Sequence, residues 1–237
     1  MKYYKVDFSQ NLNVIGTTTQ LRDIDPKCNY HVDAPYSFKK IKLNEPIKEH
    51  IRIPDMLLTP KAKWTDLLST SMLGYLFRII SNDFHEILNE FNIDDFQTLE
   101  IKLTKDKEIR NYKALYFINR FEHAFVNWKE CSFGLVDKGF APIKNILEKY
   151  TFNTLEDYEK KESIIFEERR FKLKNLVVRF NRNIELDFFK CLYPISGHFC
   201  SERLKDKIME KGFTGFRFEE LHDLDKSYWP IDHLDNI

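Results

Sequence analysis

One pattern occurs twice in this chain, in Ser81–Leu103 (SNDFHEILNEFNIDDFQTLEIKL) and, 120 positions later, in Ser201–Leu221 (SERLKDKIMEKGFTGFRFEEL). Each stretch begins with serine, a residue that often caps the N-terminus of a helix, and has an acidic residue in the first turn. Each helix is predicted to end at an asparagine or a glycine, which tolerate the left-handed C′ conformation best. A strand that starts near a phenylalanine follows. The sequence therefore predicts two copies of a strand–Ser–helix–strand unit, at residues 76–103 and 196–221. The residues that carry this motif are Ser81, Asn92, Ser201, Gly212, Gly215 and Phe216.

The rest of the chain predicts an α+β fold with a mixed or antiparallel sheet and a few helices. Alternation of apolar and polar residues predicts strands, and a helical spacing of apolar residues predicts helices. The predicted strands are 3–8 (at a sheet edge), 38–43, 51–53, 76–80, 96–103, 112–119, 169–180 and 184–189. The predicted helical regions are 84–91 and 142–161, with Thr154 as the cap of a short second helix within the latter.

Domain organisation follows from the distribution of turn residues. Five prolines between positions 26 and 60 predict that residues 1–60 are largely irregular. A Gly/Ser-rich linker is absent from the whole sequence. Residues 1–237 are therefore predicted to form a single composite α+β domain.

Composition excludes several classes of protein. Lys and Arg together number 37, and so do Asp and Glu, so the formal net charge is zero. This balance excludes a globally basic nucleic-acid clamp and a strongly acidic nucleic-acid mimic. The first ten residues do not have the pattern of a signal peptide, and the longest apolar stretch, 72–80, is too short to span a membrane. Four scattered cysteines indicate free thiols, so we expect a cytoplasmic protein.

The segment GHFCSERLKDKIMEKGFTGFRFEEL, residues 197–221, resembles the C-terminal signature of a bacterial polymorphic-toxin immunity family, immunity family eleven, also described as a domain of unknown function. The positions that fit the pattern are Ser201, Leu204, Ile208, Gly212, Phe213, Gly215, Phe216 and Phe218. A second block, from about Leu76 to Phe133, is similar to the other block of that family. It ends in VNWKECSF, where Ser132 matches and Asn127 stands in place of the family's acidic residue.

This resemblance implies a function as well as a fold. It implies an α+β immunity protein that binds a cognate toxin, encoded next to it, and neutralises it stoichiometrically without catalysis. No cofactor or metal is implied. Neither a membrane nor a nucleic acid is expected as a partner.

Two alternatives from other classes start from charged residues. Glu100 and Lys102 lie two apart on a predicted strand and so point the same way, as in the E-x-K half of a metal-dependent nuclease or hydrolase site. The aspartate that such a site needs has no obvious candidate in the sequence, because Asp94 and Asp95 are too close and Asp83 is on a helix. The basic strand 169–182, which carries six Lys and Arg residues and no acidic one, is also compatible with a nucleic-acid-binding module.

Other combinations of reactive residues have plainer interpretations. His198, Cys200 and Cys191 lack the spacing of a structural zinc site, so the cysteines are predicted to lie in the core. Ser81 and Ser201 precede helix N-termini, which attract anions, but helix capping already explains both serines.

The toxin-contacting surface is predicted at the acidic C-terminal segment. Exposed charge clusters accelerate association, and tyrosine and tryptophan are enriched among the residues that dominate interface energetics. The predicted partner-binding residues are Asp223, Asp225, Tyr228 and Trp229. The alternative is that Trp229 packs against the helix that starts after Ser201, in the second copy of the unit, and has only a structural role.

Overall fold

Four α-helices and thirteen β-strands give the part of the chain that the structure describes an α+β fold, as predicted. The structure is a computed structural model that describes residues 2–74, 76–118, 125–137, 146–168, 171–181, 184–191 and 193–221. Its strands form a six-stranded mixed sheet, a four-stranded antiparallel sheet and a three-stranded antiparallel sheet.

The first copy of the predicted unit lies in the six-stranded sheet. Its elements are β4 (Leu67–Leu68), β5 (Arg78–Ser81), α2 (Asn82–Leu88), β6 (Phe96–Lys105) and β7 (Glu108–Phe117). The strands before and after the helix are separated by β7, which is antiparallel to both. The order across the sheet is β4-β5-β7-β6, and β3 (Met56–Leu58) and β2 (Leu21–Ile24) continue it beyond β6.

The second copy has the same arrangement, but its middle strand comes from the other end of the chain. Its elements are β11 (Phe188–Cys191), β12 (Gly197–Ser201), α4 (Glu202–Glu210), β13 (Phe216–Glu220) and β1 (Tyr3–Phe8). The order is β11-β12-β1-β13, so β1 takes the place that β7 has in the first copy. The prediction that β1 is an edge strand is wrong, because both of its partners come from the last 41 residues of the sequence.

Strand register relates the two copies residue by residue. In each copy the capping serine lies opposite a tyrosine of the middle strand, and the phenylalanine that starts the last strand lies opposite another phenylalanine. These pairs are Ser81–Tyr112 and Phe96–Phe117 in the first copy, and Ser201–Tyr3 and Phe216–Phe8 in the second. The outer strands and helix starts thus correspond at a spacing of 120 residues, and the middle strands at 109. Each of the two segments thus runs from a strand through a capping serine and a helix to a second strand.

Both serines cap their helices as predicted. Ser81 and Ser201 have extended backbones, with φ/ψ of −64°/157° and −66°/159°. Their hydroxyl oxygens accept the backbone N–H of Phe84 at 3.1 Å and of Leu204 at 3.2 Å. Each serine thereby satisfies one of the N–H groups that a helix leaves unpaired at its start.

The predicted helix ends are right in the second copy and wrong in the first. Gly212 follows α4 with φ of +70°, and the backbone N–H groups of Gly212 and Phe213 donate to Met209 and Ile208 at 3.1 Å, which is a Schellman motif. Asn92 does not have this role. Helix α2 ends four residues earlier, and Asn44 and Asp106 are the only residues other than glycine with positive φ among those described. Asn92 instead makes contacts with the second copy that local sequence rules do not describe.

Three further predictions are wrong. Residues 38–40 of the predicted strand 38–43 form a 3-10 helix, because the Ser37 side chain accepts the N–H of Lys39. Residues 51–53 contribute a single bridge, between Arg52 and Ser37. In the predicted helix 142–161, residues 142–145 lie outside the described ranges, 148–150 form strand β9, and helix α3 begins at Leu155 after the Thr154 cap.

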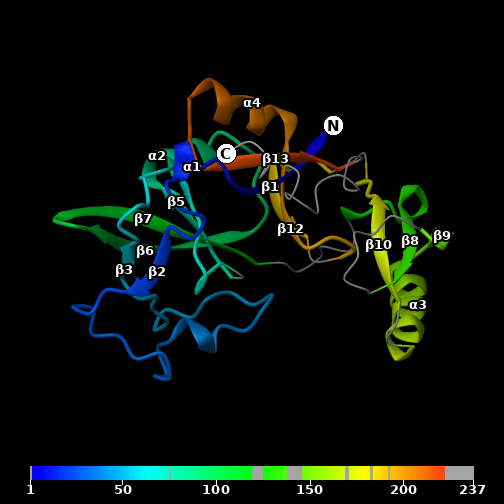
Figure 1. The fold of residues 1–237 in the computed structure, drawn as a ribbon, viewed down its shortest axis with the longest axis horizontal. Helices are drawn as coiled ribbons and strands as arrows, with labels where there is room; N and C mark the ends of the chain where they lie inside the picture. The colour runs from blue at the N-terminus through cyan, green and yellow to red at the C-terminus, as the bar shows by residue number, and fades with distance from the viewer. Residues whose placement is uncertain are drawn as a thin grey trace.

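The central core lies between the two copies. Alternate residues of each sheet point into it, together with the apolar faces of α2 and α4, which Figure 1 shows on the same side of the molecule. Residues at corresponding positions of the two copies belong to this core: Ile80 and Cys200, Phe84 and Leu204, Leu88 and Ile208, and Leu115 and Val6.

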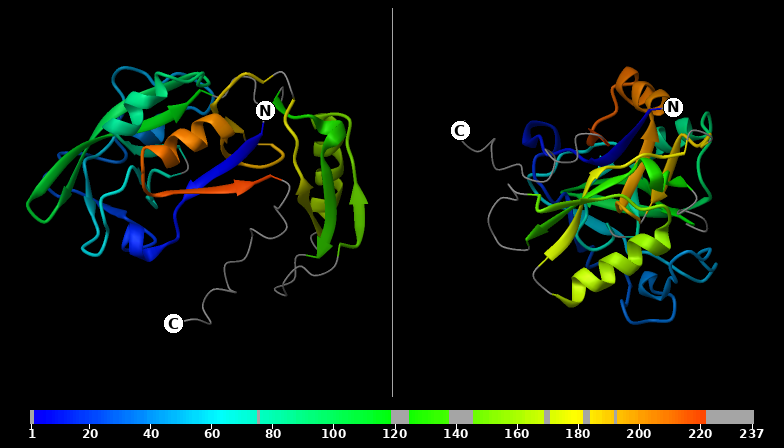
Figure 2. Two further views of the ribbon diagram at one scale, coloured as in Figure 1. Left: turned by 90° about the horizontal axis from the view of Figure 1, so that it is seen from above. Right: turned by 90° about the vertical axis from the view of Figure 1, so that its right-hand side faces the viewer.

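The outer face of each copy is covered by a different part of the chain (Figures 1 and 2). Residues from about 12 to 77 pack on the first copy and include α1 (Leu12–Ile15), β2, β3 and the 3-10 helix η1 (Phe38–Lys40). A separate lobe packs on the second copy. Its elements are the 3-10 helix η3 (Trp128–Glu130), β8 (Ser132–Asp137), β9 (Glu148–Tyr150), α3 (Leu155–Glu167) and β10 (Phe171–Val177).

Candidate functional site

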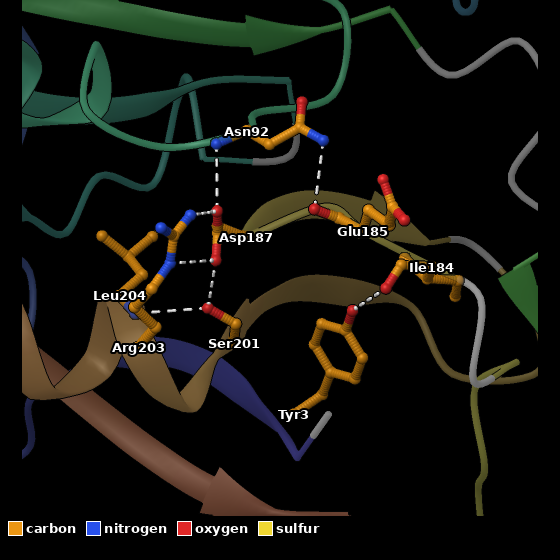
Figure 3. Close-up of polar contacts among 8 residues, drawn as sticks. All are labelled: Tyr3, Asn92, Ile184, Glu185, Asp187, Ser201, Arg203 and Leu204. Carbon is orange, nitrogen blue, oxygen red and sulfur yellow. Dashed lines mark hydrogen bonds and ion pairs between the residues drawn. The ribbon is translucent and has the colours of Figure 1, made fainter.

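A buried aspartate ties the second copy to the first (Figure 3). The side chain of Asp187, which precedes β11, is fully buried. Its carboxylate accepts hydrogen bonds from Ser201 Oγ at 2.6 Å, from the backbone N–H of Asn92 at 3.0 Å and from Arg203 Nε at 3.2 Å. Arg203 also forms an ion pair with the other carboxylate oxygen. We call this group of contacts the Asp187 clasp.

The charged form of Asp187 is stabilised within this clasp. Burial by itself raises the pKa of the carboxyl group, but hydrogen bonds from Arg203, Ser201 and the N–H of Asn92 outweigh it, so the pKa lies below its ordinary value. Ser201, Arg203 and the backbone of Asn92 supply hydrogen-bond donors to the carboxylate, as a buried charge requires. Asp187 therefore has a structural explanation.

The first copy has a corresponding clasp. Asp66 precedes β4, and its carboxylate accepts from Ser81 Oγ at 2.8 Å and from the backbone N–H of Thr214 at 2.8 Å. Thr214 belongs to the turn after α4, just as Asn92 belongs to the turn after α2. Each aspartate thus binds the serine of its own copy and the post-helix turn of the other. Because each serine hydroxyl is next to a carboxylate, neither helix start has the features of an anion site.

An open polar groove lies beside α2, with a volume of about 650 Å³. Helix α2 forms one wall and strands β6 and β7 form the floor. Asp55, which precedes β3, lies on the other side. The lining residues are Asp55, Asn82, His85, Glu86, Glu100, Lys102, Asn111 and Lys113. We call it the α2 groove.

The α2 groove presents donors and acceptors of both charges. Glu100 and Lys113, which face each other across β6 and β7, form an ion pair. Burial, and then the charge of Lys113, lowers the pKa of His85, so this imidazole is neutral at neutral pH. Asn82 Oδ1 is buried and has no hydrogen-bond partner among the described residues. A buried acceptor of this kind costs free energy until a donor reaches it.

No protein-family model matches the sequence, and no curated protein matches it either.

The predicted site residues fall into three groups. Asp223, Asp225, Tyr228 and Trp229 lie outside the described residues. So do Arg169, Arg170 and Arg182 of the basic strand, while Lys172 lies exposed on β10. Glu100 and Lys102 both line the α2 groove, as their spacing on one strand predicts.

His198, Cys191 and Cys200, the zinc ligands weighed in the sequence analysis, are all buried. The described residues include no group of three or more His, Cys, Asp or Glu side chains that could hold a metal ion. Cys191 and Cys200 are buried free thiols, and His198 Nδ1 accepts a hydrogen bond from Arg78 Nε at 3.0 Å. None of the helices within the described ranges combines the length and the apolar character that a membrane span requires.

Sequence reasoning missed most of the α2 groove. Asp55 reaches it because β3 pairs in parallel with β6, and its carboxylate accepts the backbone N–H of Lys102 at 3.1 Å. Nothing local in the sequence indicates that pairing. For Asn111 and Lys113 the sequence did hold a signal: alternate residues of a strand point to the same face, so these two side chains are expected on one face of β7.

Proposed function

We propose that this protein is an immunity protein that neutralises a bacterial toxin by stoichiometric binding, without catalysis. The observation that carries the proposal is the α2 groove, which is open, mixed in charge and built on the paired strands β6 and β7. Its ion pair, its neutral imidazole and its unpartnered acceptor are the kinds of group that give a protein–protein contact its specificity.

The residues that carry the family resemblance have structural roles in this fold. Ser201 caps α4, and Gly212 ends it in the left-handed conformation. Gly215, with φ of +91°, lies where a Cβ would be 2.2 Å from the carbonyl oxygen of Leu67. These positions build the junction between the two copies. The resemblance therefore concerns how the chain folds, and the binding surface has to be found elsewhere.

Co-purification tests this proposal directly. The protein would be co-expressed with the toxin encoded by the neighbouring gene, and we expect a 1:1 complex and rescue of growth. Trp229→Ala tests the predicted C-terminal contact: weaker toxin binding at unchanged thermal stability supports it, whereas lower stability with unchanged binding assigns Trp229 a structural role. If the toxin neither binds the protein nor loses activity in its presence, the proposal is wrong.

A second candidate function has one specific observation in its favour. The α2 groove brings Asp55 to Glu100 and Lys102, so the carboxylate that the E-x-K pattern lacked in the sequence is present in space. Two carboxylates and a lysine are the side chains with which some nucleases hold a divalent ion and stabilise developing charge. The second candidate is therefore a metal-dependent nuclease.

A nuclease assay separates the two functions. The purified protein would be incubated with single-stranded and double-stranded nucleic acid and Mg²⁺ or Mn²⁺. The immunity proposal expects no cleavage above background. Cleavage that is lost in Glu100→Gln and in Lys102→Met would establish the nuclease instead.

A further inference from the structure

In the second copy, the buried side chain of Tyr4 lies at the position that corresponds to Lys113 in the α2 groove. The Tyr4 side chain is 4% exposed, and its hydroxyl donates to a Glu202 carboxylate oxygen at 3.1 Å. Lys205 Nζ lies 4.2 Å from the ring centroid and Lys2 Nζ lies 5.0 Å from it. Lys2 also forms a 2.7 Å ion pair with Glu220. An aromatic ring with a hydroxyl group thus occupies this position in the second copy.

The first copy has a different residue at each of these positions except one. At the spacings of 120 and 109 residues given above, Asn82 corresponds to Glu202, His85 to Lys205, Asn111 to Lys2 and Lys113 to Tyr4. Only Glu100 corresponds to a residue of the same type, Glu220. Lys113 turns to Glu100. The acceptor equivalent to Glu202, Asn82 Oδ1, consequently has no donor among the described residues.

We propose that the α2 groove is the site at which this protein binds a tyrosine side chain of its partner protein. The ring lies beside His85, and the Asn82 amide turns toward the groove so that its Oδ1, buried in the free protein, accepts a hydrogen bond from the phenol hydroxyl. This inference rests on the proposed function, because the partner that would carry the tyrosine is the toxin. It specifies that function further by naming the contact. The remaining groove residues, among them Glu86, Lys102 and Asn111, then face the residues on either side of the tyrosine.

The charges of the groove favour a neutral donor over an ion. Asp55, Glu86 and Glu100 line the groove and disfavour an anion. Lys113 and the start of α2, where the backbone N–H groups carry partial positive charge, disfavour a cation next to Asn82. A phenol supplies a neutral hydroxyl donor on an apolar ring, which is the combination that Tyr4 provides in the second copy.

Titration with a tyrosine probe tests the site without the toxin. Isotope-labelled protein would be titrated with N-acetyl-tyrosinamide and, as the matched control, N-acetyl-phenylalaninamide, which lacks only the hydroxyl. We expect chemical-shift changes centred on Asn82, His85 and Asn111, and binding of the phenylalanine probe about tenfold weaker, as the loss of one buried hydrogen bond implies. Absence of shifts in the groove, or equal binding of the two probes, would overturn the inference.

A double variant tests the same idea by closing the groove. Asn82→Glu with Lys113→Tyr transfers the Tyr4–Glu202 contact into the first copy, and Asn82→Leu removes the acceptor without filling the space. Both are expected to lose the tyrosine probe and to weaken toxin binding at least tenfold without lowering the melting temperature. Tyr4→Phe is the matched control, since it changes the second copy and leaves the α2 groove intact.

The outcomes separate this inference from the proposed function. If wild-type protein binds the toxin and the double variant binds it equally well, the groove is not the contact, although the protein is still an immunity protein. If wild-type protein does not bind the toxin, the immunity proposal fails, and the probe titration alone decides whether the groove binds tyrosine. If the double variant unfolds, Asn82→Leu decides the question.

Discussion

Replacing Asp187 by alanine tests whether the clasp holds the two copies together. The change leaves the buried Ser201 Oγ and the partly buried N–H of Asn92 without their acceptor. Hydrogen bonds to a charged group contribute about 1.5–3 kcal/mol each. Arg203 adds little, because its side chain is 61% exposed and solvent screens its ion pair. We therefore expect Asp187→Ala to lower the free energy of unfolding by about 3–5 kcal/mol, a large part of a typical domain's stability.

Urea denaturation measures this loss, and Asp66→Ala is the matched control. Asp66 makes the corresponding contacts in the first copy, but its hydrogen bonds to Thr214 are exposed, so we expect a loss of only about 1–2 kcal/mol. The pKa of Asp187 is lowered in the folded state, so its contribution is present above the unfolded value of 3.8 and is lost as the pH falls through the folded pKa. The two aspartate variants would contradict this argument if Asp187→Ala cost no more than Asp66→Ala at pH 7.

Three further predictions follow from other parts of the structure. Gly215→Ala is expected to lower the melting temperature more than Gly212→Ala. A Cβ at Gly215 would lie 2.2 Å from the carbonyl oxygen of Leu67. A Cβ at Gly212 would meet no atom within 4 Å, so that substitution costs only about 1–2 kcal/mol of left-handed backbone strain. Burial, and then neighbouring positive charge, holds the pKa of His198 well below 6.5, so the unfolded chain binds a proton that the folded protein does not. Between pH 7.5 and 5.5 the unfolding free energy of wild-type protein should therefore fall by about 1.4 kcal/mol more than that of His198→Gln. Glu100→Gln should change the unfolding free energy by less than about 0.5 kcal/mol, since this side chain is 69% exposed, and a larger loss in urea denaturation would show that its ion pair is structural.

Local rules predicted the parts of the fold that depend on neighbouring residues. Ser81 and Ser201 cap their helices because an extended serine reaches the N–H three residues on, and Gly212 ends α4 because glycine adopts positive φ without strain. The spacing of 15 residues from each serine to its phenylalanine also predicted equivalent strand starts. These features hold whatever the rest of the chain does.

Predictions failed where a distant segment decides the local structure. Asparagine is a residue type that often ends a helix, yet the backbone N–H of Asn92 donates to Asp187, 95 residues later in the sequence. The strand Tyr3–Phe8 has edge-like composition, and its central place depends on β12 and β13. Asp55 enters the α2 groove through a parallel pairing with no short-range signal. In each case the deciding contact joins residues more than 45 positions apart.

The internal duplication separates the residues that build the fold from those that are free to serve function. At the clasps both copies keep an aspartate and a serine, and each aspartate reaches into the other copy, so loss of either would loosen the junction between them. At four of the five groove positions compared above the copies differ, although corresponding strands and helices surround them. Equal packing demands would have favoured equal residues there. The second copy uses Tyr4 to bury its Glu202 acceptor, whereas the first leaves Asn82 Oδ1 without a donor from the described chain. An unpartnered buried acceptor lowers the stability of the first copy, and no contact among the described residues offsets this loss. For that reason we look for function in the α2 groove.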